Sequence, residues 1–293
     1  MKLLVMGANG MAGHMIAVYF MERGYQVTGF DRRLPTYCTQ GLRGDAQDKD
    51  AVRDLVRNGG YTAVINCIGL LNQFAEDDKA LAAYLNAYFP HFLADITKDL
   101  PTQVVHMSTD CVFSGKRGGY TEEDLRDGES FYDRSKALGE LEDEKNITLR
   151  NSIVGPDINP QGIGLLNWFM TQTGEVNGYT RAVWTGQTTL QLAKTMEAAI
   201  LQKASGLVNA VPQEPITKFN LLRLFSRHLC NNRITIHACE GTPVDKSLIR
   251  TRFTFDYFIP DYEIMVRELA AWMRAHRSMY PHYSICDEGA AHE

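Results

Sequence analysis

The sequence lacks the features that would assign the protein to a membrane or to nucleic acid. Its 293 residues contain no apolar run of the roughly 18–20 residues that a membrane helix requires. There is no basic excess either, because 30 lysines and arginines are opposed by 35 acidic residues, which gives a net charge of −5. Since binding to nucleic-acid phosphates depends on clustered cations, we expect neither a nucleic-acid partner nor a membrane partner.

The sequence also lacks the cysteine spacing of metal sites and disulfide frameworks. Its six cysteines are scattered, with no C-x-x-C pair. The short apolar run at the start passes at once into glycines, which is typical of a first β-strand rather than of a signal peptide. We therefore expect reduced thiols, no bound metal and a cytoplasmic location. Whether a divalent ion assists a phosphate ligand stays open.

Strand-like and helix-like segments alternate through the first half of the chain. Apolar strand patterns occur at 3–8, 26–31, 62–69, 103–110 and 147–155. Helical patterns lie between them, at 11–24, 46–60, 76–99 and 131–144. This alternation predicts a doubly wound parallel sheet with right-handed crossovers.

The pattern changes after about residue 155, where glycine, proline and asparagine cluster. Beyond a loop expected at 176–189, we predict short helices and strands at 165–172, 190–202, 206–211, 221–229, 233–239 and 263–274. The chain is therefore divided into a sheet domain, 1–155, and a smaller α/β lobe, 156–293, which is interleaved with it. The polar end, 287–293, is expected to be frayed.

Three glycines, Gly7, Gly10 and Gly13, follow the first strand and open the first helix. In such a turn, glycines allow a sharp bend, close approach of the backbone to a pyrophosphate, and tight packing of the helix on the sheet. The helix N-terminus then offers free N–H groups to the phosphates. This context predicts a Rossmann-type dinucleotide site that includes Asn9 and Met11; a tight turn without a ligand is the alternative.

The type of dinucleotide is ambiguous. Asp31, at the end of the second strand, could accept hydrogen bonds from ribose hydroxyls, which favours NAD. Arg32 and Arg33 follow it, and either could pair with a 2′-phosphate, which favours NADP. Asp45 is placed to meet the adenine, or is a surface aspartate. The prediction is therefore NAD or NADP.

The strand at 62–69 ends in Cys67, Ile68 and Gly69. In an open α/β sheet, ligands bind outside the carboxyl ends of the strands. Backbone at this position would face the cofactor, and an ordinary strand end is the alternative.

Tyr132 and Lys136 are four residues apart in a predicted helix and therefore share one face of it. A tyrosine normally ionises too high for acid–base work at neutral pH. A nearby ammonium favours the phenolate and lowers the pKa of the tyrosine. The ammonium could also hold the nicotinamide ribose. An exposed helical pair is the alternative.

Ser108, Thr109 and Asp110 stand at the carboxyl end of the strand at 103–110. A hydroxyl group at that edge of the sheet could donate a hydrogen bond to a substrate carbonyl. Together with the glycine loop and the tyrosine–lysine pair, these residues complete a candidate oxidoreductase site.

The chain resembles an extended short-chain dehydrogenase/reductase, and within that superfamily the dTDP-4-dehydrorhamnose reductase group. The resemblance is carried by GANGMAG, AEDDKALAAYLNA, HMSTDCVFSG, YDRSKALGE and LRNSIVG. It spans the first half of the chain and is looser in the second.

The resemblance implies a role for each matching position. Tyr132 would be the general acid, Lys136 would tune it and bind the ribose, and Thr109 would hydrogen-bond the carbonyl. Asn86 would support the site on the cofactor side, with a helix-surface amide as the alternative. Asp110 would orient the loop or touch the sugar.

The chain departs from that group on the sugar side. Cys111 stands where a tyrosine is common, and the segment NGYTRAVWTGQTT lacks the usual proline. The hexose and the nucleotide are therefore open. Candidate substrate contacts are Ser108, Asp110, Asn167, Trp168, Arg181, Trp184 and Thr185, because arginine suits a pyrophosphate and tryptophan can stack on a base or sugar. A core anchor is the alternative for Trp168.

The sequence therefore predicts an NAD(P)-dependent reductase of a nucleotide-linked keto-sugar, in deoxysugar or surface-polysaccharide biosynthesis. Two alternatives stay open: an epimerase or dehydratase on the same scaffold, and a non-catalytic NADP-binding regulatory subunit. The expected partner is a nucleotide sugar, and the oligomeric state, with a homodimer as one possibility, is not decided.

Overall fold

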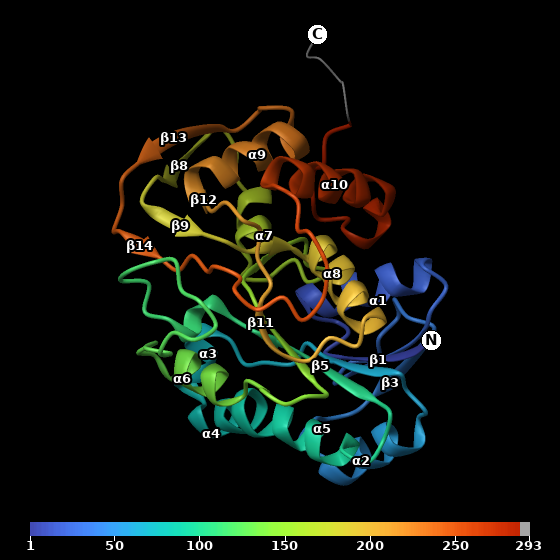
Figure 1. Cartoon of the computed structure of the whole chain (residues 1–293). Coiled ribbons are helices and arrows are strands. Elements are labelled where there is room, and N and C mark those ends of the chain that lie inside the picture. The colour runs from blue at the N-terminus through green and yellow to red at the C-terminus, as the bar shows by residue number, and fades with distance from the viewer. Residues whose placement is uncertain (288–293) are drawn as a thin grey trace.

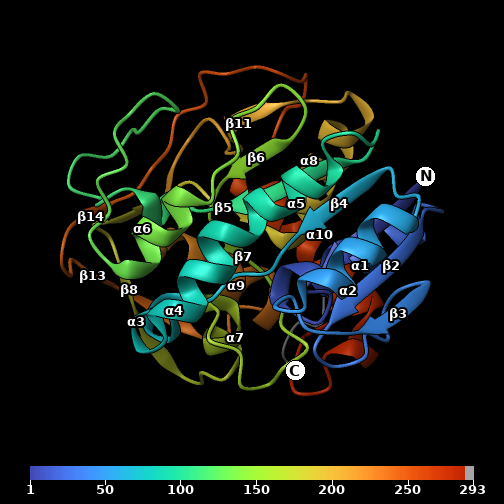
Figure 2. The same ribbon diagram turned by 90° about the horizontal axis from the view of Figure 1, so that it is seen from below.

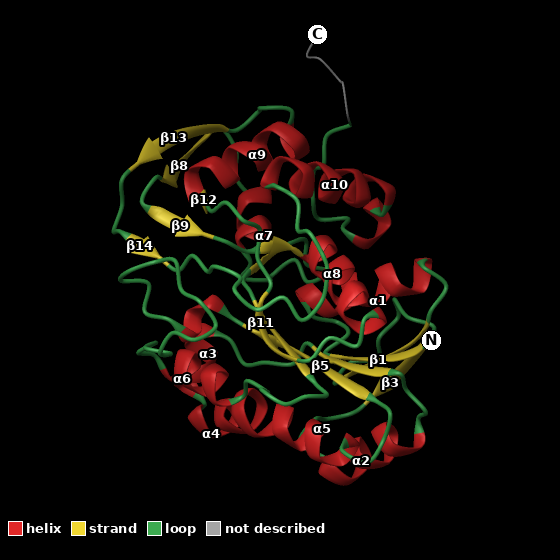
Figure 3. Ribbon diagram, viewed as in Figure 1, coloured by secondary structure: helices red, strands yellow, loops and turns green. Residues whose placement is uncertain are grey.

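A seven-stranded parallel sheet forms the centre of the molecule in the computed structural model, which describes residues 1–287 (Figures 1 and 3). In spatial order its strands are β3 (Gln40–Arg43), β2 (Gln26–Asp31), β1 (Lys2–Met6), β4 (Ala63–Asn66), β5 (Gln103–Ser108), β6 (Ile147–Arg150) and β11 (Gly206–Asn209). The chain moves outward from β1 to β3 and then returns to β4 on the other side of β1. This reversal opens a crevice at the carboxyl ends of β1 and β4. The predicted doubly wound sheet is confirmed.

Helices cover both faces of the sheet. Helices α1 (Met11–Glu22) and α8 (Thr189–Leu201) lie on one face, and α2 (Lys49–Asn58) and α5 (Phe89–Thr97) on the other (Figures 1 and 2). Strand β1 shows why both faces are covered, because side chains alternate along a strand. Leu3 and Val5 are buried with the residues of α1 and α8, whereas Leu4 and Met6 are buried with those of α2 and α5.

The single helix predicted at 76–99 is wrong in detail. The chain forms α3 (Asn72–Asp77), α4 (Lys79–Ala82), a π-helical segment η1 (Ala83–Tyr88) and then α5. Asp78 separates the first two helices, because its carboxylate accepts the N–H of Leu81 as an N-cap. Pro90, where a bend was expected, lies in the first turn of α5, since proline has no N–H for a regular helical hydrogen bond. The irregularity thus falls just before the proline.

Beyond residue 155 the chain contributes to both parts of the molecule. α8 and β11 belong to the large sheet domain, whereas α7 (Leu165–Met170), α9 (Lys218–Cys230) and α10 (Tyr262–Ala275) pack together above it (Figure 1). The predicted loop at 176–189 is wrong, because it contains β8 (Glu175–Tyr179), β9 (Ala182–Trp184) and β10 (Gln187–Thr188). Their partners are distant in sequence: β8 pairs with β13 (Thr235–Cys239), and β9 pairs with β12 (Ile216–Thr217) and β14 (Val244–Asp245).

Other boundaries also differ from the prediction. The polar edge strand β3 was missed, and the segment 147–155 divides into β6 and β7 (Ile153–Val154), which pairs with β10. Helix α6 (Phe131–Leu138) ends at Gly139, where a Cβ atom would lie 1.9 Å from the Asn86 carbonyl oxygen. Two short 3₁₀ turns follow β5 and α10, at Asp110–Val112 and Arg277–Met279.

Most of the end predicted to be frayed, 288–293, lies outside the described residues. Within residues 1–287, no helix combines the length and the apolar character needed to cross a membrane.

A buried ion pair joins α6 to the sheet. The Arg150 guanidinium on β6 donates two hydrogen bonds to the Glu140 carboxylate, from Nε at 2.9 Å and from Nη2 at 2.8 Å. The two side chains are 0% and 1% exposed. Glu140 also accepts a hydrogen bond from the Ser108 hydroxyl at 2.6 Å and one from Arg126. Arg150 in turn reaches Asn209 on β11, so the pair connects three strands.

We expect Arg150→Leu to destabilise the fold strongly. The substitution leaves the Glu140 carboxylate buried without its main partner, and breaking a buried pair in this way typically costs about 3–5 kcal/mol. Urea unfolding followed by circular dichroism measures the loss. The matched control is Arg57→Leu, which removes a two-fold pair with Asp99 of similar geometry on the exposed surface. Equal losses in the two variants would contradict the importance assigned to the buried pair.

Candidate active site

Two cavities meet at the crevice between β1 and β4. The first, of about 230 Å³, is lined by the glycine loop, the end of β2 and the segment 44–47; we call it the glycine-loop cavity. The second, of about 400 Å³, contains Thr109, Tyr132 and Lys136; we call it the tyrosine cavity. Both are lined by Gly10, Cys67, Ile68 and Gly69, so the end of β4 is their common wall. A long ligand could therefore extend from one cavity into the other.

The glycine loop has the geometry of a phosphate cradle. Gly7 adopts a φ of +79°, which side chains rarely tolerate, and a Cβ atom on Gly13 would lie 2.0 Å from the Gly7 carbonyl oxygen. Gly10 is the N-cap of α1, and no side chain of residues 1–287 caps that end. The free N–H groups and the positive end of the helix dipole are thus left for an anion. These residues fit the pyrophosphate of a dinucleotide.

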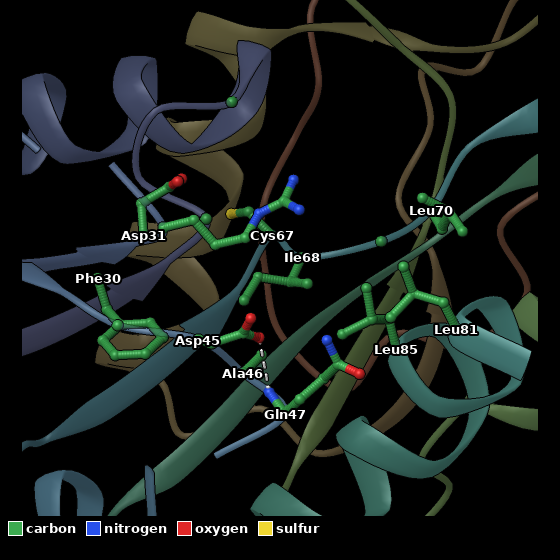
Figure 4. Close-up of a pocket in the computed structure, with 15 residues that line it drawn as sticks. Phe30, Asp31, Asp45, Ala46, Gln47, Cys67, Ile68, Leu70, Leu81 and Leu85 are labelled. Atoms are coloured by element: carbon green, nitrogen blue, oxygen red, sulfur yellow. Dashed lines mark hydrogen bonds between the residues drawn. The ribbon is translucent and has the colours of Figure 1, made fainter. Parts of the chain in front are cut away.

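Two carboxylates line the glycine-loop cavity. Asp31 accepts the backbone N–H of Asn9 at 3.1 Å. Asp45 accepts that of Gln47 at 2.9 Å (Figure 4). The apolar wall is made by Phe30 on one side and by Leu81 and Leu85 on the other (Figure 4). A flat ring with polar edges, such as adenine, suits this combination.

A more open hollow of about 570 Å³ adjoins the loop. Its lining combines Asn9, Gly10, Asp31, Arg32, Arg33, Asp157 and Asn159. The acidic residue that favours NAD and the arginines that favour NADP therefore border the same space, and the geometry is compatible with either cofactor.

Helix α6 presents Tyr132 and Lys136 to the tyrosine cavity. Ser130 is its N-cap. The Ser130 hydroxyl accepts the N–H of Asp133, and the Asp133 carboxylate accepts the N–H of Ser130. This reciprocal cap fixes the helix start. Both functional side chains are buried in the cavity wall, so the alternative of an exposed helical pair is wrong.

The Tyr132 phenol is kept protonated by its surroundings. Burial raises the pKa of Tyr132, and a hydrogen bond with Thr109 opposes that effect only in part. The expectation that the pKa of Tyr132 would be lowered is not met, because desolvation and the negative charges of Cys111, Asp110 and Asp133 all raise it. The Thr109 oxygen accepts the N–H of Cys111 at 3.1 Å, and its hydroxyl donates to Asp110 at 3.2 Å.

Lys136 lies deeper in the wall. Its Nζ atom donates to the Met107 carbonyl oxygen at 2.6 Å and lies 3.5 Å from His106 Nε2. Burial lowers the pKa of Lys136 to about 8, and the charges of Glu140 and Cys67 oppose that shift. The lysine is therefore closer to titration at neutral pH than an exposed lysine.

The side chain of Asn86 joins the segment after β4 to α6 by hydrogen bonds. It is fully buried, so the surface-amide alternative is wrong. Its Oδ1 accepts the N–H of Leu70 at 2.8 Å, and its Nδ2 donates to the Leu70 carbonyl at 2.9 Å and to Ser135 at 3.1 Å. The π-helical segment points this amide between the end of β4 and α6, so that it supports the common wall without lining it.

The predicted substrate contacts are placed differently. Ser108 and Thr109 line the tyrosine cavity, whereas Asp110 is buried behind Thr109. In the described structure none of Asn167, Trp168, Arg181 and Trp184 lines either cavity.

The last four residues have other surroundings. Asn167 is buried and holds the segment 157–163, by donating to the carbonyl oxygens of Pro160 and Gly162. Trp184 is 4% exposed and anchors a core cluster. Trp168, considered as a core anchor, is 43% exposed. Arg181 lies on the surface, 3.8 Å from Glu240.

Several lining residues of the tyrosine cavity were missed. Asn151, Ser152 and Ile153 follow β6, and the rule that ligands bind at carboxyl strand ends would have found them. Asn151 is notable because its Oδ1 is buried and has no hydrogen-bond partner within residues 1–287. Four more, Leu71, Asp157, Ile163 and Gly164, come from loops whose path the sequence does not reveal, and Asn72 begins α3.

Comparisons with known proteins agree with this geometry. A family model described as the RmlD substrate binding domain matches residues 1–154. The chain is 32% identical over 143 residues to a Haloferax volcanii protein named probable low-salt glycan biosynthesis reductase Agl14, covering 48% of each chain. It is 36% identical over 148 residues to the dTDP-4-dehydrorhamnose reductase of Burkholderia thailandensis, covering 48% of this chain and 45% of the relative. The chain spans about half the length of the curated relatives it matches.

Similarity of structure extends further along the chain. The dTDP-4-dehydrorhamnose reductase of Bacillus anthracis, solved in complex with NADP, superposes with a TM-score of 0.78 at 18% identity. The superposition covers 92% of this chain and 99% of that chain. At such low identity the likeness shows the fold alone. The family model, in contrast, matches more than half of the 293 residues, and the chain therefore belongs to the family of the RmlD substrate binding domain.

Proposed function

We propose that this protein is an NAD(P)H-dependent reductase of a nucleotide-linked keto-sugar, similar to dTDP-4-dehydrorhamnose reductase. The observation that carries the proposal is that Gly10 and residues 67–69 line both the glycine-loop cavity and the tyrosine cavity, so the two cavities are adjacent. A cofactor held on the loop would reach the tyrosine. The names of the relatives, reductases of deoxysugar or glycan biosynthesis, support the same substrate class.

The proposed chemistry divides between cofactor and protein. The glycine loop would hold a reduced nicotinamide dinucleotide, whose chemistry would be the supply of a hydride to the carbonyl carbon of the sugar. Tyr132, protonated because of its burial, gives its proton to the carbonyl oxygen. Thr109 stabilises the charge that develops on that oxygen by turning its hydroxyl proton from Asp110 toward the substrate. The Cys111 N–H holds the Thr109 oxygen in place during this rotation.

The remaining binding roles follow from the placement of the residues. Asp31 or the two arginines beside it would hold the adenosine ribose, and Asp45 would meet the adenine. Residues 156–293 would mainly bind the nucleotide sugar, through the segment that carries Asp157 and Ile163 into the tyrosine cavity. We propose a cytoplasmic location, since nucleotide sugars and NADPH are substrates of that compartment, and a homodimer as the state to test.

Tyr132→Phe should abolish turnover and leave cofactor binding intact, because it removes the proton donor and retains the ring. Reduction of dTDP-4-dehydrorhamnose followed by nicotinamide absorbance, and NADPH binding followed by fluorescence, measure the two effects. Tyr179→Phe, at an exposed tyrosine on β8, is the control. Full activity of the Tyr132 variant would refute its role as the acid.

Thr109→Val should lower the turnover rate by about 10²–10³-fold, the usual effect of losing one hydrogen bond to a developing oxyanion. Valine keeps the shape of threonine, so substrate binding should change far less. Steady-state kinetics separate the two, since a loss confined to KM would mean that Thr109 contributes only to binding.

A reductase should consume one NADPH or NADH for each keto-sugar converted. A screen of nucleotide keto-sugars with both cofactors, with oxidation and product measured together, tests this. Product formation with no net oxidation would favour an epimerase or dehydratase. Cofactor binding without turnover on any keto-sugar, together with copurification of an unrelated enzyme, would favour a regulatory subunit.

A further inference from the structure

A row of buried polar groups lies behind Lys136 and is not used by the chemistry described above. It runs from the backbone N–H of Ile68 through Asn66 and His106 to Lys136. The side chains of Asn66 and His106 are fully buried, on the neighbouring strands β4 and β5. Ile68, at the far end, lines both cavities.

The first contact fixes the orientation of the Asn66 amide. Its Oδ1 accepts the N–H of Ile68 at 3.1 Å, so its NH₂ group is the one that faces His106 Nδ1, at 3.2 Å. An NH₂ group only donates, and His106 Nδ1 must therefore accept. Burial lowers the pKa of His106 well below its ordinary value, so the ring is neutral and carries a single proton. That proton is placed on Nε2.

The protonated Nε2 of His106 faces Lys136 Nζ at 3.5 Å. An ammonium group has only donors, so an N–H pointing at it is unfavourable, whereas a neutral amine has a lone pair that can accept this N–H. The other contact of Nζ, the Met107 carbonyl oxygen at 2.6 Å, can accept from either form. The surroundings therefore suit the neutral amine at least as well as the ammonium.

The other groups around Lys136 favour its charged form. Glu140, after α6, and Cys67, after β4, both raise the pKa of the lysine, and Tyr132 lies one turn before it on α6. Among residues 1–287, no carboxylate forms an ion pair with Nζ. Within residues 1–287, His106 is the only side chain within hydrogen-bonding distance of Lys136 Nζ.

We propose that Asn66 and His106 are positioning residues that hold a proton on His106 Nε2 against Lys136, so that this lysine can release its own proton near neutral pH. Lys136 then acts as a titrating group. The inference concerns the site of the proposed function, but its test requires neither cofactor nor turnover.

The first measurement is the tautomer of His106 in the full-length protein without added nucleotide. Nitrogen-15 NMR of labelled histidine distinguishes the two tautomers, and loss of the signals in His106→Gln assigns them. We expect the Nε2–H form. In Asn66→Asp, which keeps an acceptor for Ile68 and replaces the NH₂ donor by an oxygen, the proton should move to Nδ1. An Nδ1–H form in the unmodified protein would overturn the proposal.

The second measurement is the titration of the Lys136 amine, by NMR of labelled lysine side chains, with the resonance assigned by its loss in Lys136→Met. The unmodified protein should titrate near pH 8. Both Asn66→Asp and His106→Gln should move the midpoint upward by about one pH unit, because each turns an acceptor toward the ammonium.

His237→Gln, the same substitution at an exposed histidine on β13, is the control and should leave the midpoint unchanged. A merely structural role would change thermal stability and not the midpoint. The His106 variant adds no charge, so it separates the tautomer effect from the new carboxylate of the Asn66 variant. An unchanged or lowered midpoint in His106→Gln would refute the proposal, whatever the enzyme assays show.

Discussion

The buried pair of Glu140 and Arg150 is the interaction on which the arrangement of the site depends. Its two hydrogen bonds tie the end of α6 to β6, and Ser108 attaches the end of β5 to the same carboxylate. Tyr132 and Lys136 lie one turn apart on α6, and Glu140 follows just after that helix ends, so the pair fixes the end of the helix that carries both side chains. The desolvation of the two charges is offset by the hydrogen bonds that Glu140 accepts from Arg150, Ser108 and Arg126.

The same burial sets the protonation of the site. Removing water disfavours charged forms, so it raises the pKa of Tyr132 and lowers that of Lys136. Free tyrosine and lysine side chains have nearly equal pKa values, so these opposite shifts move the two groups apart, and the phenol holds its proton more firmly than the amine does. In the proposed mechanism, this phenol is the acid that protonates the substrate.

Where the signal is local, the sequence predicted residues that line the two cavities. The glycine loop and the tyrosine–lysine pair each lie within one short segment, and strand ends predicted the common wall at 67–69. Sequence reasoning failed where contacts join distant segments: β8 is a strand only because β13 pairs with it. The inward position of Asn86 could not be predicted either, since it depends on a π-helical turn that shifts the register of the helix faces.

Residues from the second half of the chain hold segments that line the cavities. His14, in the first turns of α1, lies 2.9 Å from the Gly10 carbonyl oxygen through Nδ1 and 2.7 Å from the Tyr280 hydroxyl through Nε2. The Tyr283 hydroxyl accepts the N–H of Asp157 and donates to Asn167, which holds the segment that lines the tyrosine cavity. Residues near 280 thus position both the phosphate loop and the substrate side. A change in this segment would therefore alter both sides of the cleft together.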